Sequence, residues 1–204
     1  MELFKIWNDR PAEKQIKEIV ELLKNGDIGL IPTDTLYAIC CDAFNARSVE
    51  RICKIKGINP EKTNLSIICA DISMASDYAR IDNSAFRLLK NLTPCPVTFL
   101  FKTTPNIPRI FRGRKIIGIR IPDSNIDREI VSQLGHPIMT TSIVYDEDDY
   151  AINPELIAEN YSGMVNFMVD GGDASTEPST IIDFSEGSPV LIRKGKFEID
   201  EEDL

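Results

Sequence analysis

Short apolar runs alternate with amphipathic segments over most of the chain. Residues 11–25 place Ile16, Ile19, Val20, Leu22 and Leu23 on one face of a helix that begins near Pro11 and ends at Asn25-Gly26. Residues 48–57, with Ser48 as the expected cap and Gly57 at the end, predict a second helix. The same period predicts helices at 84–92, 125–135 and 153–161. Apolar runs predict strands at 28–32, 64–70, 97–102, 116–122, 137–144, 166–172, 178–184 and 189–195.

The order of these elements indicates an α/β fold. Strands and helices alternate in the first and third quarters of the chain, which favours parallel pairing through crossovers. In the middle and at the end, strands follow one another directly, which favours antiparallel pairing. We therefore expect a single domain with a twisted, mixed parallel and antiparallel sheet flanked by helices. The domain should cover residues 1–197, with an acidic C-terminal tail over residues 198–204.

Charge is distributed unevenly along the 204 residues, whose formal net charge is −9. The segment from Arg87 to Pro122 contains eight Lys or Arg and no Asp or Glu, whereas residues 145–204 contain sixteen acidic residues and three basic ones. A phosphate group responds to the local field and not to the total charge. The basic segment is therefore either a local cationic surface for an anionic partner or an ordinary solvated face.

Cysteine and histidine usage narrows the chemistry. The five cysteines form no CxxC pair, so we interpret them as buried, reduced thiols and predict no metal site. His136 is the single histidine, which argues against a zinc enzyme and a histidine-dependent triad. No apolar run approaches the roughly 20 residues needed to cross a bilayer, and charged residues come early in the chain. We expect a cytoplasmic protein without a membrane partner.

Polar side chains recur where the predicted strands end. Hydroxyl groups, arginines and a carboxylate occupy these positions, at residues 33–35, 98, 120, 140–142, 179–180 and 193. Arginine binds carboxylate or phosphate with two parallel hydrogen bonds, and hydroxyls supply additional donors. Neither a Walker loop nor a GxGxxG turn is present. The residues by themselves thus indicate a polar, cationic cleft for an anion.

The segment "IPTDTLYAI", residues 31–39, resembles the Pro-Thr-(Asp/Glu)-Thr-x-Tyr-Gly-Leu signature of the YrdC-like family, which includes the threonylcarbamoyl-AMP synthases. Further segments follow in the family's order: "KIK", "TPCPVTF", "IGIRIP", "TTSIV", "PSTIIDF" and "VLIRKG". The resemblance covers about residues 10–196. The segments "NLSIICADIS" and "NSAFRLLKNLTP" are most similar to the YciO branch.

The resemblance implies a large concave cationic cleft and a synthase activity. Such enzymes join L-threonine, bicarbonate and ATP, the last with Mg²⁺, into threonylcarbamoyl-adenylate and release pyrophosphate. A transferase then uses the adenylate for the N6-threonylcarbamoyladenosine modification of tRNA. Alternative functions are a YciO-type protein that binds tRNA or double-stranded RNA with weak or no synthase activity, and a carbamoyl-adenylate hydrolase.

The resemblance also implies roles for individual residues. The catalytic residues would be Lys54, Lys56 and Arg120. The substrate-binding residues would be Thr33, Asp34, Thr35, Tyr37, Thr98 and Thr141, although Asp34 fits a plain turn former equally well. The nucleotide-binding residues would be Ser142, Ser179, Thr180 and Arg193. This chain departs from the family pattern where Ile143-Val144 replace Ala-Asn and where "KIKG" lacks the usual Arg-Pro. ATP handling is therefore the step most affected.

Overall fold

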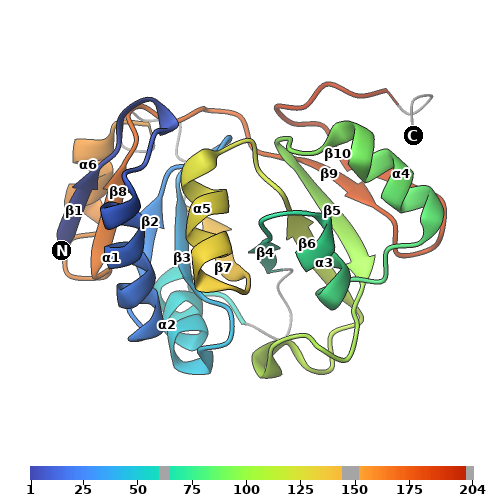
Figure 1. Ribbon diagram of the computed structural model, residues 1–204, viewed down its shortest axis with the longest axis horizontal. Coiled ribbons are helices and arrows are strands. Elements are labelled where there is room, and N and C mark those ends of the chain that lie inside the picture. The colour runs from blue at the N-terminus through green and yellow to red at the C-terminus, as the bar shows by residue number, and fades with distance from the viewer. Residues whose placement is uncertain (60–64, 144–151, 201–204) are drawn as a thin grey trace.

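The computed structural model describes residues 1–59, 65–143 and 152–200 (Figure 1). The described residues form a ten-stranded sheet with the order β1-β8-β2-β3-β7-β4-β6-β5-β9-β10. The strands are β1 (Glu2–Lys5), β2 (Gly29–Ile31), β3 (Ala38–Asp42), β4 (Ser66–Ile68), β5 (Val97–Lys102), β6 (Ile116–Arg120), β7 (Ile138–Ser142), β8 (Phe167–Asp170), β9 (Thr180–Asp183) and β10 (Val190–Arg193). The α-helices are α1 (Glu13–Lys24), α2 (Ala46–Lys56), α3 (Ile72–Tyr78), α4 (Asn83–Leu92), α5 (Asn125–Leu134) and α6 (Pro154–Asn160), and 3₁₀ turns cover η1 (Trp7–Asp9) and η2 (Arg109–Phe111).

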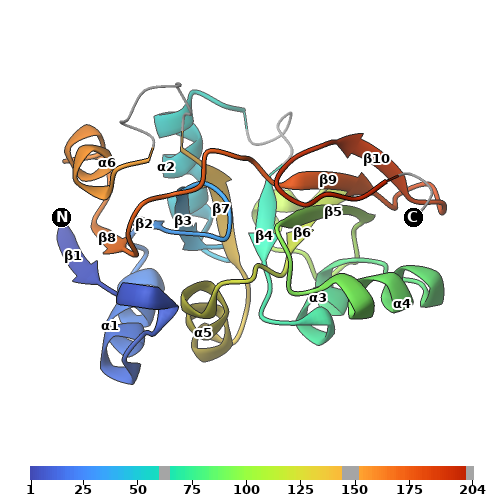
Figure 2. The ribbon, with the colours of Figure 1, turned by 90° about the horizontal axis from the view of Figure 1, so that it is seen from above.

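The predicted mixed sheet is confirmed. Four neighbouring strand pairs are parallel, β1 with β8, β8 with β2, β4 with β6, and β5 with β9, and the other neighbours are antiparallel. Helices cover both faces: α1 and α5 lie on one side of the sheet and α2 on the other (Figure 2). The apolar stripe of α1 packs with that of α5 in one buried cluster, while α2 contributes Val49, Ile52 and Cys53 to a second, larger one.

The segment that carries the PTDT sequence is the loop of a β-hairpin. β2 and β3 pair antiparallel, with Gly29 opposite Cys40 and Ile31 opposite Ala38, so residues 32–37 connect them. The pattern predicted β2 but not β3, because the β3 sequence AICCD contains a single residue with strong strand propensity, Ile39. It also did not predict β1 at the edge of the sheet or the short helix α3.

The start of α2 differs from the prediction. The helix begins two residues earlier than expected, and Asn45 is its cap: the Asn45 side chain accepts a hydrogen bond from Ser48 N at 3.2 Å. The Ser48 hydroxyl instead donates to Gly26 O at 2.7 Å, which fixes α2 to the end of α1. The predicted end is correct, since Gly57 adopts the left-handed conformation at φ 62°.

All five cysteines are buried and free, as predicted. Cys40 and Cys41 are neighbours on β3 and point into different apolar clusters. Burial raises the pKa of both thiols, which keeps them protonated and unreactive. Among the described residues, no helix is long and apolar enough to span a membrane.

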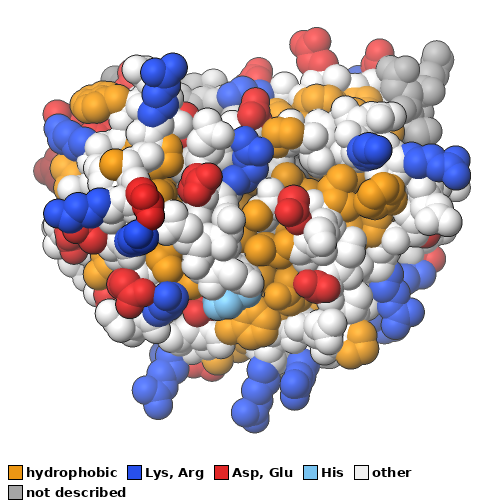
Figure 3. Space-filling view, viewed as in Figure 1, with side chains coloured by type: hydrophobic (Ala, Val, Ile, Leu, Met, Phe, Trp, Pro, Cys, Tyr) orange, Lys and Arg blue, Asp and Glu red, His pale blue; other side chains and the backbone are white. Residues whose placement is uncertain are grey.

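The helical face of the molecule is charged with both signs. In Figure 3, acidic and basic side chains are interspersed over the half that carries α1, whereas apolar side chains gather between α5 and the α3–α4 pair. This face therefore does not present a continuous electrostatic field of one sign.

Candidate functional site

A buried ion pair between Asp34 and Arg120 ties the hairpin loop to the other half of the sheet. Arg120 ends β6, and its Nη2 donates to Asp34 Oδ1. The second carboxylate oxygen, Oδ2, accepts from the backbone N–H of Asp123 at 2.9 Å. Only 7% of the Arg120 side chain and 6% of the Asp34 side chain are exposed. Because the two charges are out of water and satisfy each other, the loop is held in one position relative to β6.

Arg120 and Thr98 lie beside each other on one face of the sheet. β5 and β6 pair antiparallel with Phe99 opposite Ile119, so continuing the ladder by one residue brings Thr98 opposite Arg120. A Cβ added at Gly118 would lie 3.2 Å from Thr98 Cγ2 and 2.6 Å from Ser66 Oγ. Gly118, Thr98 and Ser66 therefore share this face, and next to Arg120 the face carries small or polar side chains.

Arg193 joins this group through Ser179. Its Nε and Nη2 donate to the carbonyl oxygen of Ser179 at 3.1 and 2.6 Å, and Nη2 lies 3.2 Å from Ser179 Oγ. The Ser179 hydroxyl is 2.8 Å from the hydroxyl of Thr98. Burial, and secondly the positive charge of Arg120, lowers the pKa of Arg193. The two guanidinium groups are thus close enough to repel each other, and an anion between them would relieve that repulsion.

A second basic group lies at the end of β7. Lys56 Nζ donates to the carbonyl of Ser142 at 2.6 Å, and partial burial lowers the pKa of Lys56. Ile68 on β4 is in register with both Arg120 on β6 and Ile138 on β7. Ser142, at the end of β7, lies four residues beyond Ile138. The two groups are therefore roughly 13 Å apart along the strands, at about 3.3 Å per residue.

The two lysines of "KIK" have different surroundings. Lys56 reaches β7, whereas Lys54 is exposed two positions earlier on α2. Residues two apart on a helix point in different directions. The register of α2 thus brings Lys56, and not Lys54, to Ser142.

Most of the hydroxyl groups of the hairpin loop are used within the protein. Thr33 Oγ1 lies 2.9 Å from Thr35 Oγ1 and donates to Leu36 O at 2.8 Å. Tyr37 is fully buried, its hydroxyl donates to Gly172 O at 2.9 Å, and it accepts from Gly171 N at 3.1 Å. Burial raises the pKa of Tyr37 to about 12. Thr35 is 2% exposed, so Thr35 and Tyr37 order the loop rather than present their side chains to solvent.

Three further predicted residues lie apart from the arginine group or outside the described chain. Thr180 is fully buried, and its hydroxyl donates to Phe197 O at 2.7 Å and accepts from Gly195 N at 3.1 Å. It therefore fixes the C-terminal segment. Thr141 stands opposite Ile39 on β7, so its side chain is on the face opposite to that of Ser142. Val144 lies outside the described residues.

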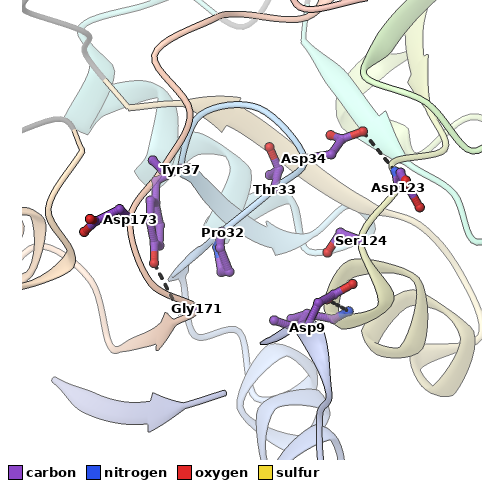
Figure 4. Close-up of a pocket in the computed structure, with 11 residues that line it drawn as sticks. Asp9, Pro32, Thr33, Asp34, Tyr37, Asp123, Ser124, Gly171 and Asp173 are labelled. Atoms are coloured by element: carbon purple, nitrogen blue, oxygen red, sulfur yellow. Dashed lines mark hydrogen bonds between the residues drawn. The ribbon is translucent and has the colours of Figure 1, made fainter. Parts of the chain in front are cut away.

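A small pocket of about 160 Å³ adjoins the hairpin loop (Figure 4). Thr33, Asp34 and Tyr37 line it from the loop, and Ser124 lines it from the start of α5. Its other polar side chains are carboxylates, those of Asp9, Asp123 and Asp173, and it has no Lys or Arg in its lining. Figure 4 shows Tyr37 and Asp173 on one side and Asp34, Asp123 and Asp9 on the other. This pocket is therefore acidic, in contrast to the arginine group around Ser179.

The described residues contain no group of three His, Cys, Asp or Glu side chains arranged to hold a metal ion.

The sequence did not single out two charged residues that the fold brings to the site. Asp127, on α5, is fully buried, and neither carboxylate oxygen has a hydrogen-bond partner among the described residues. Burial raises the pKa of Asp127 well above its usual value, only partly offset by the charge of Arg120. Lys196 donates from Nζ to the backbone carbonyl of Asp34 at 2.7 Å. Neither residue has a local sequence signal, because both reach the site from elements distant in sequence.

Comparisons with known proteins agree with this architecture. The Sua5/YciO/YrdC family profile, described as "Telomere recombination", matches residues 21–195. YciO of Escherichia coli K12, an uncharacterized protein, is 34% identical over 197 residues, which is 95% of both chains, and the E. coli YciO crystal structure has a TM-score of 0.90 at 33% identity over 100% of both chains. A putative threonylcarbamoyl-AMP synthase of Methanocaldococcus jannaschii is 32% identical over 92% of this chain and 90% of its own. Sua5 of Pyrococcus abyssi complexed with L-threonine has a TM-score of 0.85 at 25% identity, over 96% of this chain and 58% of Sua5.

The Asp34–Arg120 pair predicts a characteristic pattern of stability losses. Arg120→Ala should lower the free energy of unfolding by about 3–5 kcal/mol, because it leaves the Asp34 carboxylate buried without its cation. The double variant Asp34→Asn/Arg120→Met removes both charges and should lose less than the single variant. Urea unfolding measures both changes. A double variant that is less stable than Arg120→Ala would contradict the pairing.

Asp127 predicts a pH-dependent effect. Its pKa is raised in the fold, so between about pH 4, where the unfolded carboxyl ionises, and the higher folded pKa only the unfolded chain loses the proton. The stability of the parent therefore falls as the pH rises through this window. Asp127→Asn removes that loss, and its advantage over the parent should increase with pH. Urea unfolding at several pH values tests this, with the exposed Asp77→Asn as the control. A stability difference that does not change with pH would show that Asp127 is ionised in the fold.

Proposed function

Because the chain belongs to the Sua5/YciO/YrdC family, we propose that it is a threonylcarbamoyl-AMP synthase-like enzyme. Its substrates would be L-threonine, bicarbonate and ATP, the last bound with Mg²⁺, and its product would supply the threonylcarbamoyl modification of tRNA. The family includes threonylcarbamoyl-AMP synthases, and P. abyssi Sua5, which shares the fold, is complexed with L-threonine. The similarity to YciO alone would leave the reaction open, so the proposal depends on the site.

The observation that supports this reaction is the arrangement of cations in two groups, one around the end of β6 and one at the end of β7. Arg193 and Lys56 are held by backbone carbonyls, and no described carboxylate lies within ion-pair distance of either. They belong to groups separated by roughly 13 Å. A single carboxylate could not occupy both groups, whereas an extended anion such as a nucleoside triphosphate could. Thr140, Ser66 and Gly118 are in register across β7, β4 and β6, and these three small residues leave that part of the face without bulky groups.

The chemistry follows from these groups. The amine of threonine attacks bicarbonate and, with loss of water, gives a carbamate. A carbamate oxygen then attacks the α-phosphorus of ATP, the bond from that phosphorus to the bridging oxygen breaks, and pyrophosphate leaves. Arg120 and Arg193 offset the charge that accumulates on the phosphoryl oxygens, and the hydroxyls of Thr98 and Ser179 orient them. Lys56 would stabilise the other end of the ligand.

An assay for adenylate formation from ATP, bicarbonate and labelled threonine tests the proposal. Arg193→Ala should weaken ATP binding by roughly tenfold to a hundredfold, the loss expected for hydrogen bonds to a charged group. Arg193→Lys should recover only part of it, because lysine lacks the two-pronged geometry. Arg80→Ala is the control, since Arg80 also donates to a carbonyl, that of Thr103, and does so from an exposed position.

No adenylate formation by the parent would refute synthase activity. Conversion of added threonylcarbamoyl-adenylate into AMP, threonine and bicarbonate would instead identify a hydrolase that uses the same residues.

A second candidate function, RNA binding, is favoured by the basic segment around η2. Arg109 and Arg112 are exposed beside α2, the helix that carries Lys54 and Lys56. Arg114 differs from them, because its guanidinium lies 5.9 Å from the ring centre of Phe111 and is partly buried. Such a surface would bind phosphates of tRNA or duplex RNA without reading sequence.

For RNA binding we expect Arg112→Glu to weaken the affinity for tRNA or duplex RNA and to reduce its salt dependence. Lys14→Glu, at a position whose side chain is 87% exposed on α1, is the matched control. Arg114 is left unchanged, because reversing its charge would also disturb the packing on Phe111. Filter binding at several salt concentrations gives both quantities. An absence of RNA binding by the parent at low salt would exclude this function.

A further inference from the structure

The C-terminal segment brings an additional cation to the Asp34–Arg120 pair. Lys196 follows β10, and its Nζ donates to Asp34 O at 2.7 Å. The side chain of that same aspartate holds Arg120, which lies within electrostatic range of Arg193. Asp34 therefore contacts two cations, Arg120 from β6 and Lys196 from the C-terminal segment, which also carries Arg193.

The backbone on both sides of Lys196 is fixed. Lys196 N donates to Pro178 O at 2.9 Å, and Phe197 N donates to Thr180 Oγ1 at 3.1 Å. Gly195 packs so closely that an added Cβ would lie 2.3 Å from Pro178 O. The direction in which the Lys196 side chain leaves the backbone is consequently set by the fold, and it points to the hairpin loop.

The charges in this group are not balanced. Asp34 is the carboxylate in contact with Arg120, and no described carboxylate forms an ion pair with Arg193 or Lys196. An ammonium group has three N–H donors, and Lys196 uses one of them, toward a neutral carbonyl. Two donors and a full positive charge remain for a ligand, and the Arg193 guanidinium, three residues earlier in the chain, likewise has no carboxylate partner among the described residues.

We propose that Lys196 is a phosphate-binding residue that, together with Arg193, binds the di- or triphosphate part of the ligand. Two uncompensated cations match a phosphate chain better than a single carboxylate, which Arg193 alone could hold with two hydrogen bonds. The proposal rests on the proposed function for the identity of the nucleotide, but not for the binding of phosphate itself. The hairpin loop then has a second role, because the Asp34 carbonyl positions the Lys196 ammonium group for the ligand.

The test uses the full chain and measures the binding of inorganic pyrophosphate and tripolyphosphate by calorimetry. Lys196→Met should weaken the binding of tripolyphosphate by about tenfold or more, the loss expected for a charged hydrogen bond. Lys196→Arg keeps the charge and should retain most of the affinity. Lys194→Met is the matched control, because Lys194 is exposed two residues away and makes no hydrogen bond or ion pair with the described residues. The binding of L-threonine should be the same in Lys196→Met and in the parent.

Two outcomes would overturn the proposal. One is a Lys196→Met variant that binds tripolyphosphate as tightly as the parent while Arg193→Ala does not. The other is a parent protein that binds neither phosphate chain at low ionic strength, where screening is weakest. Thermal unfolding of Lys196→Met without ligand shows whether the fold is intact, and little change is expected because the side chain is exposed. A failed adenylate assay with Lys196-dependent tripolyphosphate binding would refute the proposed reaction and leave this inference standing.

Discussion

The contact between Asp34 and Arg120 joins two halves of the molecule that are 86 residues apart in sequence. On one side stands the β2–β3 hairpin, whose loop is organised by Thr33, Thr35 and the buried phenol of Tyr37. On the other side stands β6, followed by α5. Between them, the backbone N–H of Asp123 donates a hydrogen bond to the Asp34 carboxylate. Since both charges are almost fully buried, separating them would leave an unpaired charge in a medium of low polarity. The loop therefore has one defined position, which also fixes the positions of the groups that contact it, such as Lys196 and the backbone N–H of Asp123.

The pair also separates charges of opposite sign. The pocket lined by Thr33 and Tyr37 contains the carboxylates of Asp9, Asp123 and Asp173, while Arg193 and Lys196 belong to the neighbouring group around Ser179. Asp34 stands between the two regions and takes part in both. A ligand with a phosphate chain is attracted to one region and repelled by the other, so electrostatics orient it before any specific contact forms.

The chain is similar both to YciO, which it matches in length, and to the longer Sua5 proteins. E. coli YciO aligns along its whole length, whereas Sua5 of P. abyssi contains a large additional part outside the aligned region. The portion aligned with Sua5 covers 96% of this chain and 58% of Sua5. The site described for this chain is formed without a counterpart of that additional part.

The sequence by itself determined the elements that have strong local signals. The helical period of α1, the glycine that ends α2 and the apolar run of β5 are properties of a few neighbouring residues, and they predicted the class of fold correctly. The hydroxyls and arginines at strand ends likewise indicated an anion site, and the signature around Asp34 indicated the family. Strand β3 was not predicted in this way, because its sequence AICCD contains a single residue with strong strand propensity, Ile39.

Only the tertiary structure decided which of the candidate residues act together. The strand register places Thr98 beside Arg120 and puts Ser142 roughly 13 Å away along the same face. The packing of the C-terminal segment brings Lys196 to Asp34, and the burial of α5 leaves Asp127 without a hydrogen-bond partner among the described residues. These relations depend on contacts between residues far apart in the chain, and the free energy of a buried charge depends on all of its surroundings. A local pattern contains neither, which is why the charge balance of the site became visible only in the folded protein.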